Sequence, residues 1–185
     1  ERSKMTKLWQ KGNNSLNSEA EKFTVGNDYL LDRELVKYDA TASIAHAEML
    51  HKIGILSSSE LAKLKAALKE IIVAAEKGQF EIKQDDEDCH TAIENYLVGK
   101  VGEAGKKIHT ARSRNDQVAA ALRLYMLGKL GEIAAAATGL KNEISAAAKR
   151  NKNVPLPGYT HMQKAMPSSV AMWCAGFEAA VEDDL

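Results

Sequence analysis

Apolar residues recur at intervals of three and four through most of the chain, which is the spacing of one face of an α-helix. One such series predicts a helix over about residues 28–53. Its apolar positions are Leu31, Leu35, Tyr38, Ala42, Ala45 and Met49. A second predicted helix starts at the capping-box pair Ser57 and Glu60 and ends at Gly78. Turn-forming residues in segment 1–27 predict irregular structure before the first helix.

Two shorter segments follow the second helix. Residues 80–82 alternate between apolar and polar side chains, which fits either a short strand or an extended link. The acidic run 85–88 predicts the start of another helix that continues to about Val101, because carboxylates stabilise helix N-termini.

The longest apolar series extends from Val118 to Ala147 and predicts a helix over about residues 115–149. That length exceeds an ordinary globular helix and is typical of a helical bundle or coiled coil. Residues 151–157 predict a break, a loop follows at Thr160 and His161, and a last apolar segment starts at Ser168. The sequence stops at Leu185 without an evident cap, which reads as a truncation within a helix.

Composition agrees with a helical protein, because alanine is abundant and the 3 prolines lie close together at positions 155, 157 and 167. Strands should therefore be few. Lysine plus arginine equals aspartate plus glutamate, at 25 each, so the charge balance favours neither nucleic acid nor an anionic membrane as partner. A site that binds an anion must therefore arise from a local cluster of residues and not from the net charge of the chain.

The expected compartment is the cytoplasm. Cys89 and Cys174 lie far apart without a CxxC spacing, which gives no disulfide framework and fits a reducing environment. No apolar run is long enough to cross a bilayer, and the first residues lack the apolar centre of a signal peptide.

The candidate anion site is the polar run His109–Gln117, which reads HTARSRNDQ and lies directly before the longest predicted helix. Residues Ser113 to Asp116 should therefore lie at or near a helix N-terminus, whose free N–H groups and positive dipole bind carboxylates. The simpler alternative is that the run is only a helix cap with solvated arginines.

This run closely resembles the HTGRSRNDQ signature of argininosuccinate lyases, with Ala111 in place of the usual glycine. Two further segments resemble motifs of the same family in the same order. They are EDCHTAIE at residues 87–94 and PGYTHMQKAMP at residues 157–167. Three motifs spread over most of the chain are far more specific than any single one.

The resemblance implies an all-α, L-aspartase-like fold. Residues 1–111 would form an N-terminal helical lobe, and residues 112–185 would form the first long helices of a central bundle. It also implies cleavage of argininosuccinate to arginine and fumarate, without metal or organic cofactor, in a homotetramer whose sites combine three subunits. The small-molecule substrate would be a dicarboxylate, and neither nucleic acid nor membrane would be a partner.

The resemblance also assigns candidate site residues. His161 and Thr160 are the predicted catalytic residues, with His161 assisting proton transfer either directly or by orienting another group. The predicted substrate-binding residues are Ser113, Arg114, Asn115, His90, Gln163 and Asp28. At the position of Asp28 many family members have serine.

Several alternatives stay open. Other superfamily members cleave adenylosuccinate, aspartate or malate, and a noncatalytic crystallin-like protein would retain the same fold. His90 beside Cys89 suggests a metal only weakly, because two adjacent ligands do not form a site. The family's GSSxMPxKxN loop, which carries the serine usually assigned as catalytic base, does not occur in these residues. The isolated chain is therefore expected to be inactive but helical and self-associating.

Overall fold

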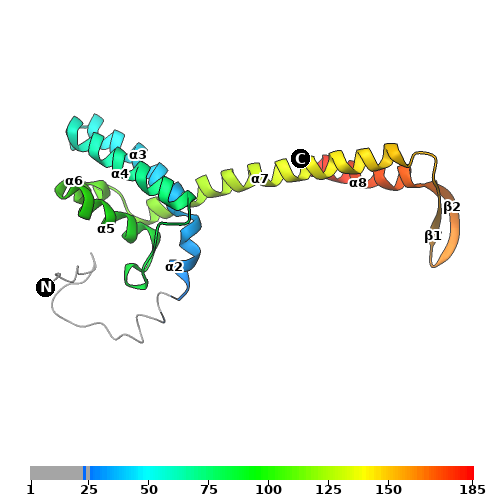
Figure 1. Cartoon of the computed structure of the whole chain (residues 1–185), viewed down its shortest axis with the longest axis horizontal. Helices are drawn as coiled ribbons and strands as arrows, with labels where there is room; N and C mark the ends of the chain where they lie inside the picture. The colour runs from blue at the N-terminus through cyan, green and yellow to red at the C-terminus, as the bar shows by residue number, and fades with distance from the viewer. Residues whose placement is uncertain (1–22, 24–25) are drawn as a thin grey trace. The chain divides into compact units, whose positions relative to one another are not determined.

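The computed structural model describes residue 23 and residues 26–185, so the predicted irregular segment 1–27 lies almost wholly outside the described residues (Figure 1). The chain divides into two compact units, of which the first ends at Arg123 and the second comprises Leu124–Leu185. The boundary falls inside the longest helix, so each unit contains part of it.

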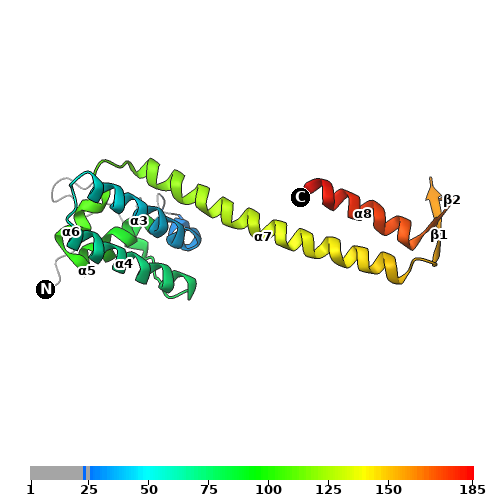
Figure 2. The same ribbon diagram turned by 90° about the horizontal axis from the view of Figure 1, so that it is seen from above.

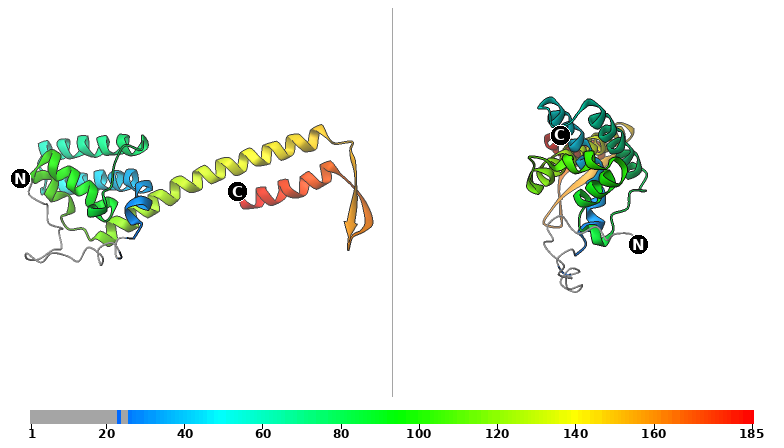
Figure 3. Two further views of the ribbon diagram at one scale, coloured as in Figure 1. Left: turned by 60° about the horizontal axis from the view of Figure 1, so that its bottom comes forward. Right: turned by 90° about the vertical axis from the view of Figure 1, so that its left-hand side faces the viewer.

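The first unit is a small helical lobe. Its elements are α2 (Asp28–Leu31), the 3₁₀ helix η1 (Asp32–Glu34), α3 (Val36–Lys52), α4 (Ser58–Glu76), the 3₁₀ helix η2 (Gln84–Asp86), α5 (Cys89–Val101), α6 (Glu103–Lys106) and the 3₁₀ helix η3 (Lys107–His109). Helices α3 and α4 lie side by side, and α4 also contacts α5 (Figure 3). The predicted capping box forms at the start of α4, where the Ser57 hydroxyl accepts from the Glu60 N–H.

The hydrophobic core of this lobe is formed by apolar side chains from all three main helices. Its largest fully buried members are Val36, Leu50, Leu56, Leu64, Leu68, Ile71, Ile82, Ile93, Leu97 and Ile108. Removing these side chains from water is the main stabilising contribution to the lobe.

The first predicted helix is interrupted. A 3₁₀ turn separates α2 from α3, and the Leu35 N–H donates to the Asp32 carbonyl in that turn. The Asp32 carboxylate accepts a hydrogen bond from the Cys89 N–H (3.0 Å). Because this contact joins residues 57 positions apart, periodicity along the chain does not reveal it.

The segment before α5 also differs from its prediction. Residues 80–82 form an extended link rather than a strand, with Ile82 buried in the core. Helix α5 begins at Cys89, later than the acidic run suggested, because Asp88 is its N-cap and accepts from the Thr91 N–H (2.6 Å). Glu87, with φ of 69°, leaves the helical conformation immediately before this cap.

The second unit contains the rest of α7 (Arg114–Arg150), the strands β1 (Pro155–Thr160) and β2 (Gln163–Ser169), and α8 (Val170–Asp184). Helix α8 runs back along the C-terminal part of α7 (Figure 2). Lys141 forms an ion pair with Glu182, and the Ser145 hydroxyl donates to Glu178, so polar contacts join the two helices. The predicted helix over residues 115–149 is confirmed to within one residue at each end.

The predicted break after α7 is present, but the segment that follows it forms an antiparallel β-hairpin rather than a loop. Its register pairs Pro155 with Ser169 and Thr160 with Gln163, with an irregularity beside Gly158. A Cβ atom at Gly158 would lie 2.8 Å from the Met166 carbonyl oxygen on the paired strand, so the close approach of the two backbones favours glycine there. Within the described residues this hairpin is the only sheet, and the other regular elements are helices. The predicted all-α class is otherwise confirmed.

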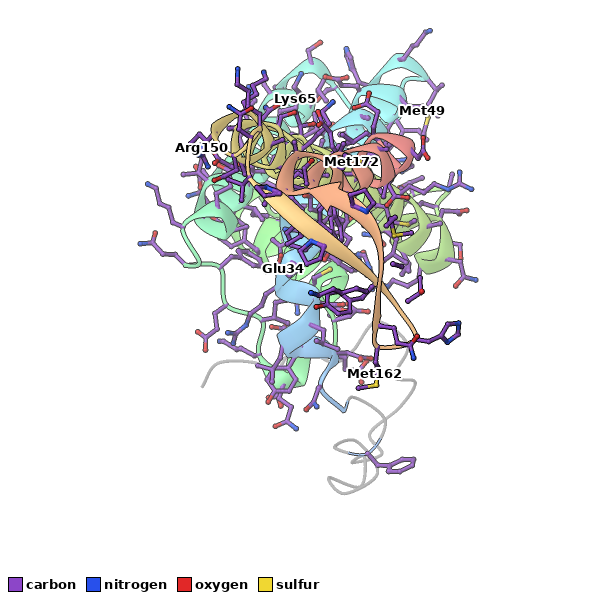
Figure 4. All side chains as sticks on the ribbon, turned by 90° about the vertical axis from the view of Figure 1, so that its right-hand side faces the viewer. Glu34, Met49, Lys65, Arg150, Met162 and Met172 are labelled. Carbon is purple, nitrogen blue, oxygen red and sulfur yellow. The ribbon has the colours of Figure 1, made fainter. Side chains whose placement is uncertain are left out.

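The turn of the hairpin consists of His161 and Met162, which both have positive φ, at 49° and 63°. Two successive residues with positive φ characterise the type I′ turn, which matches the twist of hairpin strands. Met162 lies at the tip, with 96% of its surface exposed (Figure 4). The turn therefore presents His161 to solvent.

Large apolar side chains remain exposed on both helices of the second unit. They are Met126, Leu127, Leu130, Ile133 and Leu140 on α7, and Met172, Trp173 and Phe177 on α8. Within the described residues, no helix combines the length and apolar character needed to span a bilayer.

Candidate active site

The signature run forms the turn that leads from η3 into α7. The Asn115 N–H donates to Ser113 Oγ (3.2 Å), and the Ser113 N–H donates to Asp116 Oδ2 (2.8 Å). The Ser113 hydroxyl therefore caps the helix at Asn115, and the Asp116 carboxylate in turn accepts from the backbone of Ser113. The predicted position of Ser113 to Asp116 at a helix N-terminus is confirmed.

Ala111, which replaces the family's usual glycine, has φ of 57°. L-residues are strained in this left-handed region by about 1–2 kcal/mol, whereas glycine is not. We expect Ala111→Gly to raise the free energy of unfolding by about 1 kcal/mol, measured by urea denaturation. Ala135→Gly is the matched control in the exposed interior of α7 and should lower it by about 1 kcal/mol. A loss of stability in both variants would contradict the strain at Ala111.

Arg114 is held by other side chains of the lobe. Its Nη1 donates to Glu94 Oε1 (3.1 Å) and to Gln117 Oε1 (3.0 Å), and its Nη2 donates to Thr91 Oγ1 (3.2 Å). Glu94 is buried, so its carboxylate needs this compensating positive charge. Arg114 thus joins the start of α7 to α5.

The neighbours of Arg114 are more accessible. Ser113 and Asn115 are both exposed, as is Asp28 at the first position of α2. The hydroxyl and amide side chains at the start of α7 are able to donate hydrogen bonds to an anion. Substrate contacts at these three residues stay predictions.

His90 is buried in the lobe, at 2% exposure, and its Nδ1 lies 2.9 Å from Asp39 Oδ2. Asp39 was not singled out from the sequence. With Cys89 it completes a group of three potential metal ligands whose atoms all lie within 4.8 Å of one another. Burial foremost, and then the nearby Asp32 and Asp39 charges, raises the pKa of the Cys89 thiol. The hydrogen bond between His90 and Asp39 lies in the core of the lobe.

His46 links α3 to the start of the signature turn, because its Nε2 lies 3.0 Å from the Thr110 carbonyl oxygen. Burial, and then the positive charge of Arg112, lowers the pKa of His46 below 6.5. The neutral ring is therefore favoured in the folded state, while the unfolded chain binds a proton more readily.

The stability of the lobe should therefore fall as pH decreases through the unfolded pKa of histidine. We expect His46→Gln, which retains a donor but cannot titrate, to lose less unfolding free energy than the parent between about pH 7.5 and about pH 5.5. Urea denaturation at the two pH values measures this difference. Equal losses in parent and variant would exclude His46 as a source of acid sensitivity.

The remaining predicted site residues lie on the hairpin of the second unit. Thr160 and Gln163 pair across the turn, and His161 occupies the turn itself; all three are exposed. The structure therefore groups the predicted residues into two sets. One set is carried by α2, α5 and the start of α7 in the first unit, and the other by the hairpin.

Sequence reasoning missed several polar residues that organise the first set. They are Asp39 and Ser43 on α3, Glu94 on α5 and Gln117 on α7. Glu94 and Gln117 are the last residues of two of the motifs, whereas Asp39 and Ser43 lie outside all three motifs.

Comparison with known proteins shows which family this chain belongs to. A family model described as "Lyase" matches residues 16–185. The argininosuccinate lyase of Thermotoga neapolitana is 48% identical over 179 residues, which cover 97% of this chain and 45% of that protein. The argininosuccinate lyase of Bacteroides fragilis is 43% identical over 97% of this chain and 40% of its own length. The chain thus spans less than half the length of these relatives.

Among solved structures, the fumarate lyase:delta crystallin of Brucella melitensis in native form matches with a TM-score of 0.74. It is 21% identical and covers 90% of this chain, which spans 43% of that one. At this identity the likeness concerns the fold, and it agrees with the predicted helical class. The curated relatives confirm the resemblance drawn from the three motifs, and the match over residues 16–185 shows that the chain belongs to the lyase family.

Proposed function

We propose that the protein carrying this chain cleaves the C–N bond of argininosuccinate, releasing arginine and fumarate as a step of arginine biosynthesis. The observation that supports this most directly is the 48% identity to an argininosuccinate lyase across 97% of the chain. The chain retains Ser113, Asn115, Thr160 and His161 at the motif positions to which the family resemblance assigns site roles.

The reaction is a β-elimination. A base removes the proton from the carbon beside a carboxylate, the C–H electron pair forms the fumarate double bond, and the C–N bond breaks with protonation of the nitrogen. Negative charge builds on the carboxylate during proton removal, so fixed donors directed at that carboxylate accelerate the step. Ser113, Asn115 and the N-terminus of α7 supply such donors in this proposal.

The hairpin residues have a complementary role. The imidazole of His161 is a side chain suited to proton transfer, and the Thr160 hydroxyl can donate from the adjacent strand end. Gln163 pairs with Thr160 across the turn and presents an amide on the same exposed tip. We assign proton transfer to His161 and substrate contacts to Thr160 and Gln163.

Assembly and location complete the proposal. We assign a homotetramer to the full-length protein, in which the large apolar side chains exposed on α7 and α8 would be buried against other subunits. The free cysteines Cys89 and Cys174 agree with a cytoplasmic protein. The 185-residue chain by itself should be inactive, because it contains no copy of the loop motif expected to carry the base.

A spectrophotometric assay of fumarate formation tests the proposal. The full-length parent is incubated with argininosuccinate and, separately, with adenylosuccinate, and the 185-residue chain is assayed beside it. We expect the full-length parent to cleave argininosuccinate but not adenylosuccinate, and the 185-residue chain to cleave neither. Turnover of adenylosuccinate only would assign a different lyase activity, and a folded parent inactive on both substrates would favour the crystallin-like alternative.

A further inference from the structure

Asp39 is a fully buried carboxylate on α3 and belongs to none of the three motifs. Side chains from three helices converge on it. Oδ2 lies 2.9 Å from His90 Nδ1 on α5 and accepts from Gln117 Nε2 on α7 at 3.4 Å. Oδ1 accepts from the Ser43 hydroxyl, one turn along α3, at 3.3 Å. A carboxylate removed from water requires such partners.

Two of these partners, Gln117 and Ser43, also accept hydrogen bonds from arginines of the signature turn. Gln117 Oε1 accepts from Arg114 Nη1 at 3.0 Å. Ser43 Oγ accepts from Arg112 Nη1 at 3.1 Å. The arginines on either side of Ser113 are thus each connected to Asp39 through a single intermediate side chain.

Arg112 shows why the carboxylate matters electrostatically. Within the described part of the chain, its Nε and Nη2 atoms are buried and have no hydrogen-bond partner. Burial lowers the pKa of Arg112, while the charges of Asp39 and Glu94 oppose that shift. Negative charge on α3 and α5 therefore favours the charged form of this buried guanidinium.

We propose that Asp39 is a positioning residue, which through Ser43 and Gln117 fixes the two arginines and thereby orients Ser113 and Asn115 toward the substrate carboxylate. The orientation of the turn follows from contacts within the lobe. Its consequence for substrate binding rests on the proposed function.

The first test measures the turn itself, by hydrogen exchange with mass spectrometry on the 185-residue chain. Ser43→Ala removes the link to Arg112 while leaving the carboxylate in place. We expect amide exchange over residues 112–117 to accelerate about tenfold, the effect of losing a hydrogen bond to a charged group. Asp39→Asn should have at least this effect, and Ser43→Ala decides the matter if Asp39→Asn does not fold.

Glu48→Gln is the matched control, because it lies on the same helix and removes only the exposed ion pair with Lys65. It should change exchange over residues 112–117 by less than about twofold. Unchanged exchange there in folded Ser43→Ala would overturn the proposal.

The second test measures substrate binding in the full-length parent. If Ser43→Ala displaces the turn, Ser113 and Asn115 no longer meet the substrate carboxylate, so KM should rise and kcat should fall, each by about tenfold. A lower thermal midpoint with unchanged KM and kcat would mean that the Asp39 network contributes only to stability. That result would overturn the proposal that it orients Ser113 and Asn115 toward the substrate. A parent without argininosuccinate cleavage would remove the proposed function, whereas the exchange experiment would still decide the positioning of the turn.

Discussion

His161→Asn in the full-length parent is expected to lower kcat for argininosuccinate cleavage by about 10²–10⁴-fold, the usual contribution of a general acid or base. Asparagine cannot titrate, so the variant loses proton transfer at this position. Asparagine also tolerates positive φ better than most residues, so the turn at 49° should be preserved. The expected loss is therefore one of chemistry rather than of hairpin geometry.

Met162→Asn provides the matched control for this variant. It places the same side chain at the next turn residue, where φ is 63°, and should leave kcat within about threefold of the parent. Asn115→Ala should differ from both by weakening substrate binding as well as turnover, because it removes a fixed donor. Fumarate absorbance at varied argininosuccinate measures all three, and near-parental kcat in His161→Asn would remove His161 from the mechanism.

Leu68→Ala should lower the free energy of unfolding of the first unit by about 2–5 kcal/mol, because it leaves a cavity in a closely packed core. Leu68 is fully buried on α4, the helix that contacts both α3 and α5. Hydrogen exchange of amides in these three helices, measured in increasing urea, reports on this unit separately from the second.

Leu31→Ala is the control, with the same chemical change in the same unit. Leu31 lies at the end of α2 and is 69% exposed, so its truncation should cost less than about 0.5 kcal/mol. Similar losses in the two variants would mean that the buried cluster around Leu68 does not dominate the stability of the lobe.

Local signals were sufficient for α4 and α7. The Ser57–Glu60 capping box marks the start of α4, and the long apolar series gives α7 nearly its full length. The α3 helix was predicted, but its buried face was not. Positions such as Tyr38, Ala45 and Met49 follow helical spacing yet remain partly or largely exposed.

The buried face of α3 is formed by Val36, Asp39, Ala40, Ser43, Ala47 and Leu50. Two of these residues are polar, so the pattern of apolar residues selected a neighbouring face. Their partners could not be inferred from local sequence either, because His90 and Gln117 lie 51 and 78 positions from Asp39. The motif residues of the site were recognisable, whereas the network that supports them depends on tertiary contacts.

The hairpin escaped prediction for a different reason. Most of its residues are exposed, so neither strand shows the alternation of apolar and polar residues that marks a half-buried strand. Its prolines and Gly158 are also typical of irregular structure. Pairing between the two strands, rather than burial of one face, defines this element.

The two-residue turn of the hairpin limits how far this protein can be stabilised by redesign. Asn-Gly is the pair best suited to two successive positive φ values, and His161-Met162 departs from it at both positions. A designer who optimised the turn for stability alone would replace the histidine to which we assign proton transfer. Of the two turn positions, only residue 162 can therefore be changed toward the preferred turn residue without removing the side chain assigned to proton transfer.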